Sequence, residues 1–132
     1  MTIVLDASAG LELALNRSRS NEIASLLETS KRVYAPNFYK AELTNALWKY
    51  LRSGQMKKVD AKEALRIGLG LIDEYLDILD YTDEVLSESV RLDHSAYDVF
   101  YLVAARRTDS TLITFDRKFR SLAAREGLDT VG

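Results

Sequence analysis

The sequence contains no cysteine and only one histidine, His94. The lack of cysteine excludes disulfide bonds and thiolate metal sites. A single histidine excludes a multi-histidine metal site and any acid–base mechanism that needs a pair of histidines. We expect His94 to be a solvated residue near a helix boundary. Any chemistry that this chain performs must therefore depend on carboxylates.

Long hydrophobic runs and a targeting segment are also missing. The first apolar stretch follows Met1 and Thr2 directly, so the sequence has neither the basic nor the hydrophobic region of a signal peptide. No apolar run approaches the roughly 20 residues of a membrane-spanning helix. We therefore expect a cytoplasmic location and no membrane partner. The length of 132 residues predicts one domain, residues 1–132, with a single core.

The chain also lacks a strong overall charge, but its charges are unevenly distributed. The formal net charge of −2 does not fit a generally basic nucleic-acid-binding protein. Residues 73–98 carry nine acidic residues and one arginine, whereas residues 106–125 carry six basic residues and two aspartates. Such asymmetry can mark a local track for a polyanion, although any single basic side chain is more typical of a solvated helix face.

Short apolar runs alternate with amphipathic segments along the chain. The pattern predicts strands over residues 3–5, 32–35, 76–81, 111–115 and 128–131, and helices over residues 9–15, 20–28, 38–53, 60–74, 83–92, 96–107 and 117–125. This alternation predicts an α/β fold with a parallel sheet and helices on both faces. Within the helix over residues 60–74, Gly68 and Gly70 either weaken the helix or allow close packing.

Two of the predicted strands bring an aspartate to their carboxyl ends. Asp6 follows the buried run Ile3-Val4-Leu5, and Asp116 follows the run over residues 112–115. In open α/β sheets, ligands bind in the crevice outside the carboxyl ends of the strands, where neighbouring strands would bring both carboxylates together. Each aspartate can instead be the N-cap of the helix that follows it.

Two further carboxylates lie near the starts of helices. Asp98 lies in a helix that is apolar nearly all round, where a buried carboxylate is costly unless it is paired or binds a cation. The alternative is a capping box between Ser95 and Asp98. Glu42 lies in the second turn of the helix over residues 38–53, so capping does not explain it, and it shares a face with Asn45 and Lys49. The alternative is an exposed glutamate paired with a lysine.

Each acid alone has an ordinary structural explanation, but the four acids together favour a metal site. Carboxylates that lie close together raise one another's pKa. Mg²⁺ and Mn²⁺ prefer carboxylate and water ligands, and such a cation removes the repulsion. A carboxylate cluster can hold one or two metals and activate a water molecule for phosphodiester hydrolysis. The hydroxyls of Ser8 and Thr114 can hold a ligand or the water in place.

Four segments of the sequence resemble the PIN-domain ribonucleases and, among them, the VapC-type toxins of toxin–antitoxin pairs. In chain order they are Val4-Leu5-Asp6-Ala7-Ser8; Pro36 with Ala41-Glu42-Leu43-Thr44-Asn45-Ala46-Leu47; Ser95-Ala96-Tyr97-Asp98 with Tyr101-Leu102 and Ala104; and Leu112-Ile113-Thr114 with Asp116 and Phe119. The resemblance covers essentially the whole chain. It implies a PIN-like three-layer α/β/α sandwich with a parallel sheet of about five strands. It also implies a Mg²⁺- or Mn²⁺-dependent endoribonuclease that cuts structured RNA such as tRNA or rRNA.

The resemblance also implies which residues form the site. Asp6, Glu42, Asp98 and Asp116 match the family's acidic quartet, and Ser8, Asn45 and Thr114 match its supporting polar groups. We expect the four acids to form the metal site. Asp6, Asp98 and Asp116 would ligate the metal directly or through water, and Glu42 would orient or deprotonate the attacking water. Three basic residues just past Asp116 are placed to bind RNA phosphates: Arg117, Lys118 and Arg120.

The resemblance implies protein partners as well. Members of the family usually form homodimers and are inhibited by a small antitoxin, whose tail lies along a groove and can bring an arginine into the acidic pocket. Candidate residues for these two interfaces lie on the helices over residues 38–53 and 60–74. They are Tyr39, Trp48, Tyr50 and Leu51, for which ordinary core packing is the alternative.

Three other functions compete with this interpretation. A phosphoacceptor receiver domain would need adjacent acids after the first strand and a lysine after the fifth, but Asp6 precedes Ala7-Ser8 and no lysine follows Leu128. A phosphatase of the D-x-D type would need an acid in place of Ser8. A PIN-like module that binds RNA or protein without cutting stays open, and metal-dependent cleavage would distinguish it from the enzyme.

Overall fold

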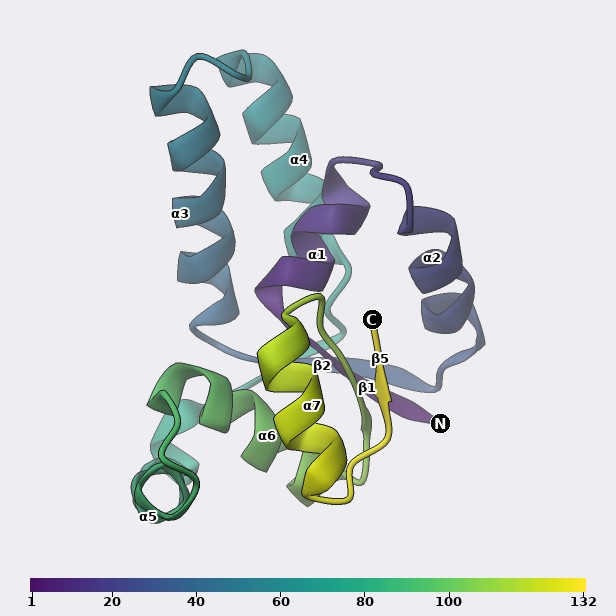
Figure 1. The fold of residues 1–132 in the computed structure, drawn as a ribbon. Helices are drawn as coiled ribbons and strands as arrows, with labels where there is room; N and C mark the ends of the chain where they lie inside the picture. The colour runs from purple at the N-terminus through teal and green to yellow at the C-terminus, as the bar shows by residue number, and fades with distance from the viewer.

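A sheet of five parallel strands forms the centre of the structure, a computed structural model that describes residues 1–132 (Figure 1). The strands are β1 (Thr2–Leu5), β2 (Arg32–Pro36), β3 (Glu74–Leu76), β4 (Thr111–Ile113) and β5 (Thr130–Val131). Their order in the sheet is β3-β2-β1-β4-β5, and every neighbouring pair is parallel. The predicted α/β fold with a five-stranded parallel sheet is confirmed.

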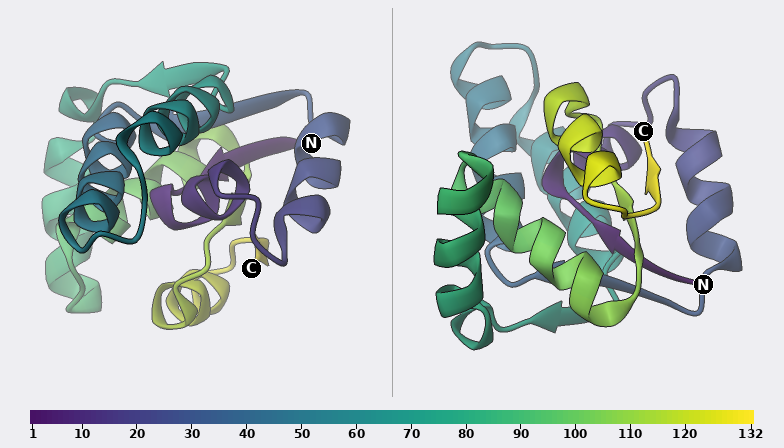
Figure 2. Two further views of the ribbon diagram at one scale, coloured as in Figure 1. Left: turned by 90° about the horizontal axis from the view of Figure 1, so that it is seen from above. Right: turned by 60° about the horizontal axis from the view of Figure 1, so that its bottom comes forward.

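Helices cover both faces of this sheet. They are α1 (Ala7–Ala14), α2 (Ser20–Thr29), α3 (Tyr39–Arg52), α4 (Lys58–Gly70), α5 (Thr82–Leu92), α6 (Ala96–Thr108) and α7 (Arg117–Arg125). Buried residues of α1 to α4 belong to one hydrophobic cluster and those of α5 to α7 to another, which gives three layers (Figure 2). No helix combines the length and the hydrophobicity that a membrane-spanning segment requires.

The two clusters lie on opposite faces of the sheet because successive strand residues point to opposite sides. On β1, Ile3 and Leu5 belong to the cluster under α1 to α4, whereas Val4 belongs to the cluster under α6. On β4, Ile113 belongs to the cluster under α1 to α4, and Leu112 belongs to the cluster under α6. All five side chains are fully buried, which explains the continuous apolar runs that predicted these strands.

The predicted strand over residues 76–81 is wrong. The third strand lies earlier, at Glu74–Leu76, and the chain then forms a short 3-10 helix, Ile78–Asp80. The carboxylate of Asp77 accepts a hydrogen bond from the amide of Leu79 at 2.9 Å. A local bond of this kind favours a turn over an extended strand. The apolar–acidic alternation that resembled a half-buried strand therefore belongs to a turn in which Leu79 is exposed.

Tyr39 packs where α1, α3 and α4 meet. Its side chain is fully buried, and its hydroxyl donates a hydrogen bond to the carbonyl of Gly68 at 2.7 Å. A Cβ atom at Gly68 would lie 2.5 Å from Cδ2 of Leu43, and one at Gly10 would lie 2.2 Å from the hydroxyl oxygen of Tyr39. Gly68 thus allows close packing, as one of the two alternatives predicted, whereas Gly70 has open space beside it. For Tyr39, the alternative of core packing is confirmed, so this residue is not part of a protein interface.

Candidate active site

The strand order reverses at the centre of the sheet. From β1 the chain adds β2 and β3 on one side, and then β4 and β5 on the other. In open α/β sheets, this reversal creates a crevice outside the carboxyl ends of the strands. The loops after β1 and β4 carry Asp6 and Asp116, and the amide of Asp6 donates to the carbonyl of Ile113 at 3.1 Å. Two of the predicted acids therefore come from the two loops that border the crevice.

Asp6 combines burial with a capping role. Its side chain is only 6% exposed. Its Oδ1 atom accepts hydrogen bonds from the Ser8 hydroxyl at 2.6 Å and the Ala9 amide at 3.0 Å, so Asp6 is the N-cap of α1. Burial raises the pKa of Asp6 to about 6, and the nearby Asp98 adds to the rise, while the hydrogen bonds of Ser8, Thr114 and Ala9 oppose it. The predicted capping role is confirmed, and the burial disfavours the charged form of the carboxyl.

Glu42 lies in the first turn of α3 rather than the second, because the helix begins at Tyr39. Its Oε1 atom accepts a hydrogen bond from the hydroxyl of Tyr101 at 2.6 Å. Burial raises the pKa of Glu42, the bond from Tyr101 lowers it, and the charges of Asp6 and Asp98 raise it further. Glu42 forms no ion pair with Lys49, so the alternative of an exposed glutamate paired with that lysine is wrong.

Asp98 lies in the first turn of α6 and is paired with the single histidine. Its Oδ2 atom is 2.8 Å from Nε2 of His94, and the two side chains are 32% and 12% exposed. The imidazole ring stacks on Phe119 of α7 with 6.0 Å between the ring centroids. Ser95 makes no side-chain capping bond, so the capping box is not formed. The prediction of a solvated His94 is wrong, because His94 is packed between α6 and α7.

Asp116 is exposed and linked to the loop after β1. Its Oδ1 atom accepts from the amide of Phe119 at 3.1 Å, so it caps α7, as one of the two alternatives predicted. Its own amide donates to Oγ1 of Thr114 at 3.1 Å. Oγ of Ser8 accepts from the amide of Phe115 at 3.0 Å and lies 3.4 Å from Oγ1 of Thr114. The two hydroxyls therefore join the loops that carry Asp6 and Asp116.

Two of the four predicted acids, Asp6 and Glu42, have a pKa that is raised by others of the four. Asp98 raises the pKa of Asp6, and both of these acids raise the pKa of Glu42. Asp116 has no such effect on either carboxyl. No group of three or more histidine, aspartate or glutamate side chains is arranged to hold a metal ion. In this structure the four predicted acids therefore do not form a single cluster of that kind.

The donor set nevertheless fits a divalent cation in its chemistry. All four acids offer carboxylate oxygens, which are the ligands that Mg²⁺ and Mn²⁺ prefer. Burial and mutual repulsion disfavour the charged forms of Asp6 and Glu42, and a nearby cation would reverse both effects.

A cleft with a volume of about 690 Å³ lies beside Glu42, between α1 and α3. We call it the α1–α3 cleft. Eleven residues line it: Ala7, Ser8, Leu11, Glu42, Asn45, Ala46, Lys49, Tyr50, Arg52, Ser53 and Gln55. Ser8 and Glu42 belong to the predicted site as well, and Asn45 lies about one helical turn after Glu42. The predicted supporting residue Asn45 therefore lines this cleft together with Glu42 and forms no hydrogen bond to any of the four acids.

Comparison with known proteins gives the family. Residues 3–125 match the model of the PIN domain family. This chain belongs to the PIN domain family. Ribonuclease VapC3 of Pyrobaculum aerophilum is 28% identical over 122 residues, which cover 89% of this chain and 92% of the relative. The predicted resemblance to VapC-type PIN proteins is confirmed.

Solved structures of similar fold agree with this assignment. The crystal structure of PAE2754 from Pyrobaculum aerophilum has a TM-score of 0.76 at 23% identity, covering 99% of this chain and 90% of that chain. The crystal structure of VapBC2 from Rickettsia felis bound to a DNA fragment from their promoter has a TM-score of 0.70 at 19% identity, covering 99% of this chain and 98% of that chain. At these identities the likeness concerns the fold.

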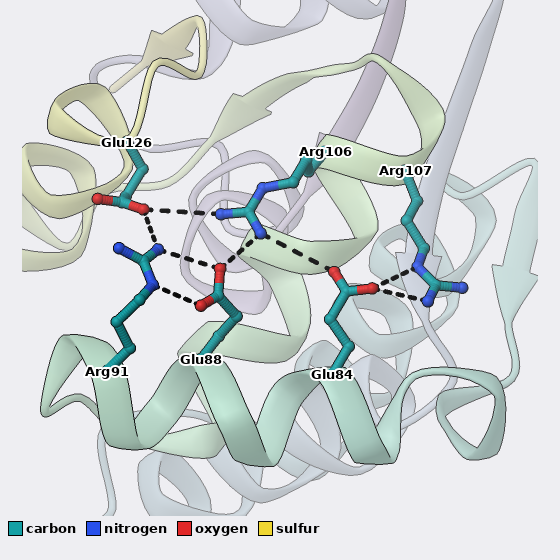
Figure 3. Close-up of polar contacts among 6 residues, drawn as sticks. All are labelled: Glu84, Glu88, Arg91, Arg106, Arg107 and Glu126. Atoms are coloured by element: carbon teal, nitrogen blue, oxygen red, sulfur yellow. Dashed lines mark hydrogen bonds and ion pairs between the residues drawn. The ribbon is translucent and has the colours of Figure 1, made fainter.

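Part of the charge asymmetry of this PIN domain is an internal pairing between α5, α6 and the end of α7, which uses Glu84 and Glu88 of the acidic segment and Arg106 and Arg107 of the basic segment. Six residues take part, as Figure 3 shows: Glu84, Glu88, Arg91, Arg106, Arg107 and Glu126. Arg106 donates to Glu88 at 2.7 Å, and Arg107 donates to Glu84 at 2.6 Å. These two arginines are therefore not free to form a track for a polyanion.

The three predicted RNA-binding residues of this PIN domain take no part in that pairing. Arg117 and Lys118 are exposed at the start of α7. Arg120 is half-buried, with its guanidinium 3.5 Å from the carbonyl of Thr114. None of the three forms an ion pair with a carboxylate. Their charges remain available beside Asp116.

The sequence interpretation missed two residues of this PIN domain that contact the predicted acids. Tyr101 lies in a helix that is apolar nearly all round, so its burial was predictable from the sequence. A buried tyrosine hydroxyl usually has a hydrogen-bond partner, and here that partner is Glu42. His94 lies four residues before Asp98, just before the N-cap of α6, so its ring can reach the first turn of that helix. Both signals were present in the sequence, although neither identifies the partner by itself.

Proposed function

We propose that residues 1–132 act as one PIN nuclease domain and a metal-dependent endoribonuclease, with Asp6, Glu42, Asp98 and Asp116 as its catalytic acids. The observation that supports this most is that Asp98 raises the pKa of the buried Asp6, and that both of these acids raise the pKa of Glu42. Burying carboxylates close together is energetically unfavourable unless their charges are compensated, for example by a bound cation. The name of the relative, Ribonuclease VapC3, supports RNA as the substrate.

The proposed roles follow from the chemistry of each side chain. When bound, Mg²⁺ or Mn²⁺ would polarise a phosphoryl oxygen and lower the pKa of a water ligand. The carboxylates of Asp6, Asp98 and Asp116 would hold the ion. Glu42 would take a proton from the attacking water, because burial and neighbouring acids raise its pKa toward the range of an effective base.

Two side chains would position these acids. The hydroxyl of Tyr101 bonds to Oε1 of Glu42, and the ring of His94 lies against Oδ2 of Asp98. Each bond occupies one oxygen of its carboxylate, and no hydrogen bond within the protein occupies the other oxygen. The free oxygens of Glu42 and Asp98 are the atoms that we assign to the water and the ion.

We also propose that the protein is the toxin of a toxin–antitoxin pair, acting in the cytoplasm on structured RNA such as tRNA or rRNA. The similarity to VapC3 and to the VapBC2 assembly supports a cognate antitoxin as a partner. A homodimer is part of the same proposal. Trp48 is 49% exposed, while Tyr50 and Leu51 are half-buried, so Trp48 is the most accessible of the predicted interface residues.

A second candidate function is a PIN-like module that binds RNA or protein without cutting. One observation favours it, namely that no group of three or more acidic or histidine side chains is arranged to hold a metal ion. The two candidates differ in a single measurable property, which is metal-dependent cleavage of RNA.

The test is to incubate purified protein with total RNA in the presence of Mg²⁺, Mn²⁺ or EDTA. The variants are Asp98→Asn and, as a matched control, Asp109→Asn at the other end of α6. Asp109 is exposed and has a φ of 52°, a conformation that asparagine tolerates well. Discrete fragments that need both the metal and Asp98, and that persist in the control, are expected. RNA binding without any cleavage by folded, metal-supplied protein would establish the binding module instead.

A further inference from the structure

The α1–α3 cleft continues directly from the proposed catalytic site. Ser8, which donates a hydrogen bond to Asp6, and Glu42 both line the cleft. Its volume of about 690 Å³ is within the range of roughly 300–1,000 Å³ that is typical of small-molecule sites. A molecule whose reacting bond lies at the acids would therefore extend into this cleft on the α3 side.

The end of the cleft away from Glu42 is basic. Lys49 and Arg52, in the last turn of α3, line the cleft, are exposed and form no ion pair with a carboxylate. Arg17 lies over the ring of Tyr50 at 5.3 Å from its centroid and donates a hydrogen bond to its hydroxyl. Arg17 also pairs with Glu12 at 3.9 Å, and Arg52 lies 4.9 Å from the ring centroid of Trp48. The cleft therefore passes from acidic groups at the catalytic end to Lys49 and Arg52, which have no carboxylate partner, at the other end. An anion is the complementary ligand for those cations.

Amide and aromatic groups line the middle of the cleft. Asn45 forms no hydrogen bond within the protein, and Gln55 uses only its amide nitrogen, which donates to Oγ of Ser53 at 2.8 Å. Free amide groups of this kind can bond to the edge of a nucleobase. The ring of Tyr50 lies on the same wall, with Arg17 over one of its faces.

The lining favours a nucleotide over a peptide helix. Only 4 of the 11 lining residues are hydrophobic. A groove that receives an amphipathic helix needs a mainly apolar lining, whereas nucleotide recognition combines cations, amides and an aromatic face. The bases of a paired RNA helix are poorly accessible to side chains, so the nucleotide that fits is an unpaired one.

We infer that the α1–α3 cleft binds an unpaired nucleotide next to the cleaved bond of the RNA. Lys49 and Arg52 bind the phosphate that neighbours the reacting one, and Asn45 bonds to the base. The inference rests on the proposed ribonuclease function. It assigns a binding site to the nucleotide that neighbours the cleaved bond and that the acids do not contact.

The test measures RNA binding separately from cleavage. Lys49→Ala and Arg52→Ala are made in the Asp98→Asn background, and binding of a labelled single-stranded RNA is followed by fluorescence anisotropy over a series of KCl concentrations. Each variant should raise the Kd about 5- to 10-fold and reduce the slope of log Kd against log salt by about 0.7, the value for one lost phosphate contact on a single strand. Lys62→Ala and Arg66→Ala, exposed on α4 and outside the cleft, are the matched controls.

A positional measurement complements the affinities. RNA that carries a photoreactive uridine beside the mapped cut site should cross-link to residues 45–55, as identified by mass spectrometry. In the catalytically active background, Lys49→Ala should raise KM with little change in kcat, because the contact is made equally in the bound state and the transition state.

Each outcome has a distinct meaning. A Kd and salt slope equal to those of the controls, or cross-links confined to α7, would overturn the inference even if the wild-type protein cuts RNA. Weaker RNA binding by both variants of a protein that never cleaves would support the subsite and contradict the nuclease proposal. An unchanged RNA Kd, together with loss of a co-purifying small protein in the Lys49→Ala variant, would assign the cleft to a protein partner and also overturn the inference.

Discussion

Nε2 of His94 lies 2.8 Å from Oδ2 of Asp98, across the start of α6. The ring of His94 stacks on Phe119 of α7, so its position depends on how α7 packs against α6. An outer hydrogen bond of this kind fixes the rotamer of the carboxylate that it touches. The orientation of Asp98 is therefore set by residues outside its own turn of helix.

His94→Ala should reduce both cleavage and metal affinity. Loss of an outer partner of a metal ligand typically costs about 10- to 100-fold. We expect the Kd for Mn²⁺, measured by calorimetry, and kcat to change within this range. His94→Gln, which keeps a polar group able to reach Asp98, should recover part of the loss. If His94→Ala leaves Mn²⁺ affinity unchanged and lowers only Tm, the histidine has a structural role alone.

Tyr101→Phe tests the second positioning contact. The change removes the hydroxyl that bonds to Glu42 but keeps the ring, which packs against Phe38 with 5.4 Å between the centroids. Because the Tyr101 bond lowers the pKa of Glu42, its loss should raise that pKa. The acid limb of the pH–rate profile should therefore move to higher pH, and kcat should fall with little change in KM.

Tyr75→Phe is the matched control for Tyr101→Phe. It removes a partly buried hydroxyl that donates to the carbonyl of Leu69 at 2.9 Å, away from the acids. The pH–rate profile of Tyr75→Phe should be the same as that of the wild type. Equal shifts in the two variants would mean that the profile reports a general change in the protein and not the Glu42 contact.

The sequence was sufficient to predict the elements that have a strong local pattern. The run Ile3-Val4-Leu5 is apolar because the strand is buried on both faces, and this pattern also located Asp6 at its end. The contact of Tyr101 with Glu42 spans 59 positions and depends on how α6 packs beside α3, which no local pattern contains. The stacking of His94 on Phe119 depends in the same way on tertiary packing.

The errors also have local physical causes. In the segment after β3, the alternation of acidic and apolar residues was compatible with a strand, but the side chain of Asp77 bonds to a nearby amide and stabilises a turn. The predicted helix over residues 60–74 ends at Gly70, which leaves Glu74 free to begin β3. Composition alone also suggested a basic track, whereas Arg106 and Arg107 pair with glutamates of α5.

Asp6→Asn should stabilise the metal-free protein at neutral pH. The pKa of Asp6 is raised from 3.8 to about 6, so the folded state binds the proton more tightly than the unfolded state. Stability that is present below about pH 4 is therefore lost as the pH rises through 6, by an amount on the order of 3 kcal/mol at most. Asparagine carries no charge and keeps an oxygen that can accept from Ala9.

The measurement is the urea midpoint of both proteins in EDTA at pH 4 and at pH 7.5. The wild type should lose stability between the two values, and Asp6→Asn should lose less. Asp116→Asn, an exposed cap at which asparagine serves equally well, is the control and should follow the wild type. A wild-type stability that rises over this interval in parallel with Asp6→Asn would contradict the predicted burial effect.

Glu88→Gln should weaken the contact between α5 and α6 in a pH- and salt-dependent way. Hydrogen bonds from Arg91 and Arg106 lower the pKa of Glu88 to about 2, so its contribution is present above pH 4.5 and is lost as the pH falls toward 2. At pH 7 we expect a Tm lower by about 2–4 °C, with a smaller difference at pH 2.5 or in 1 M NaCl. Glu63→Gln removes an isolated exposed pair with Arg66 and should change Tm less, because single surface pairs contribute little. Equal effects of the two substitutions would mean that the cluster joining α5, α6 and α7 contributes no more than an ordinary surface pair.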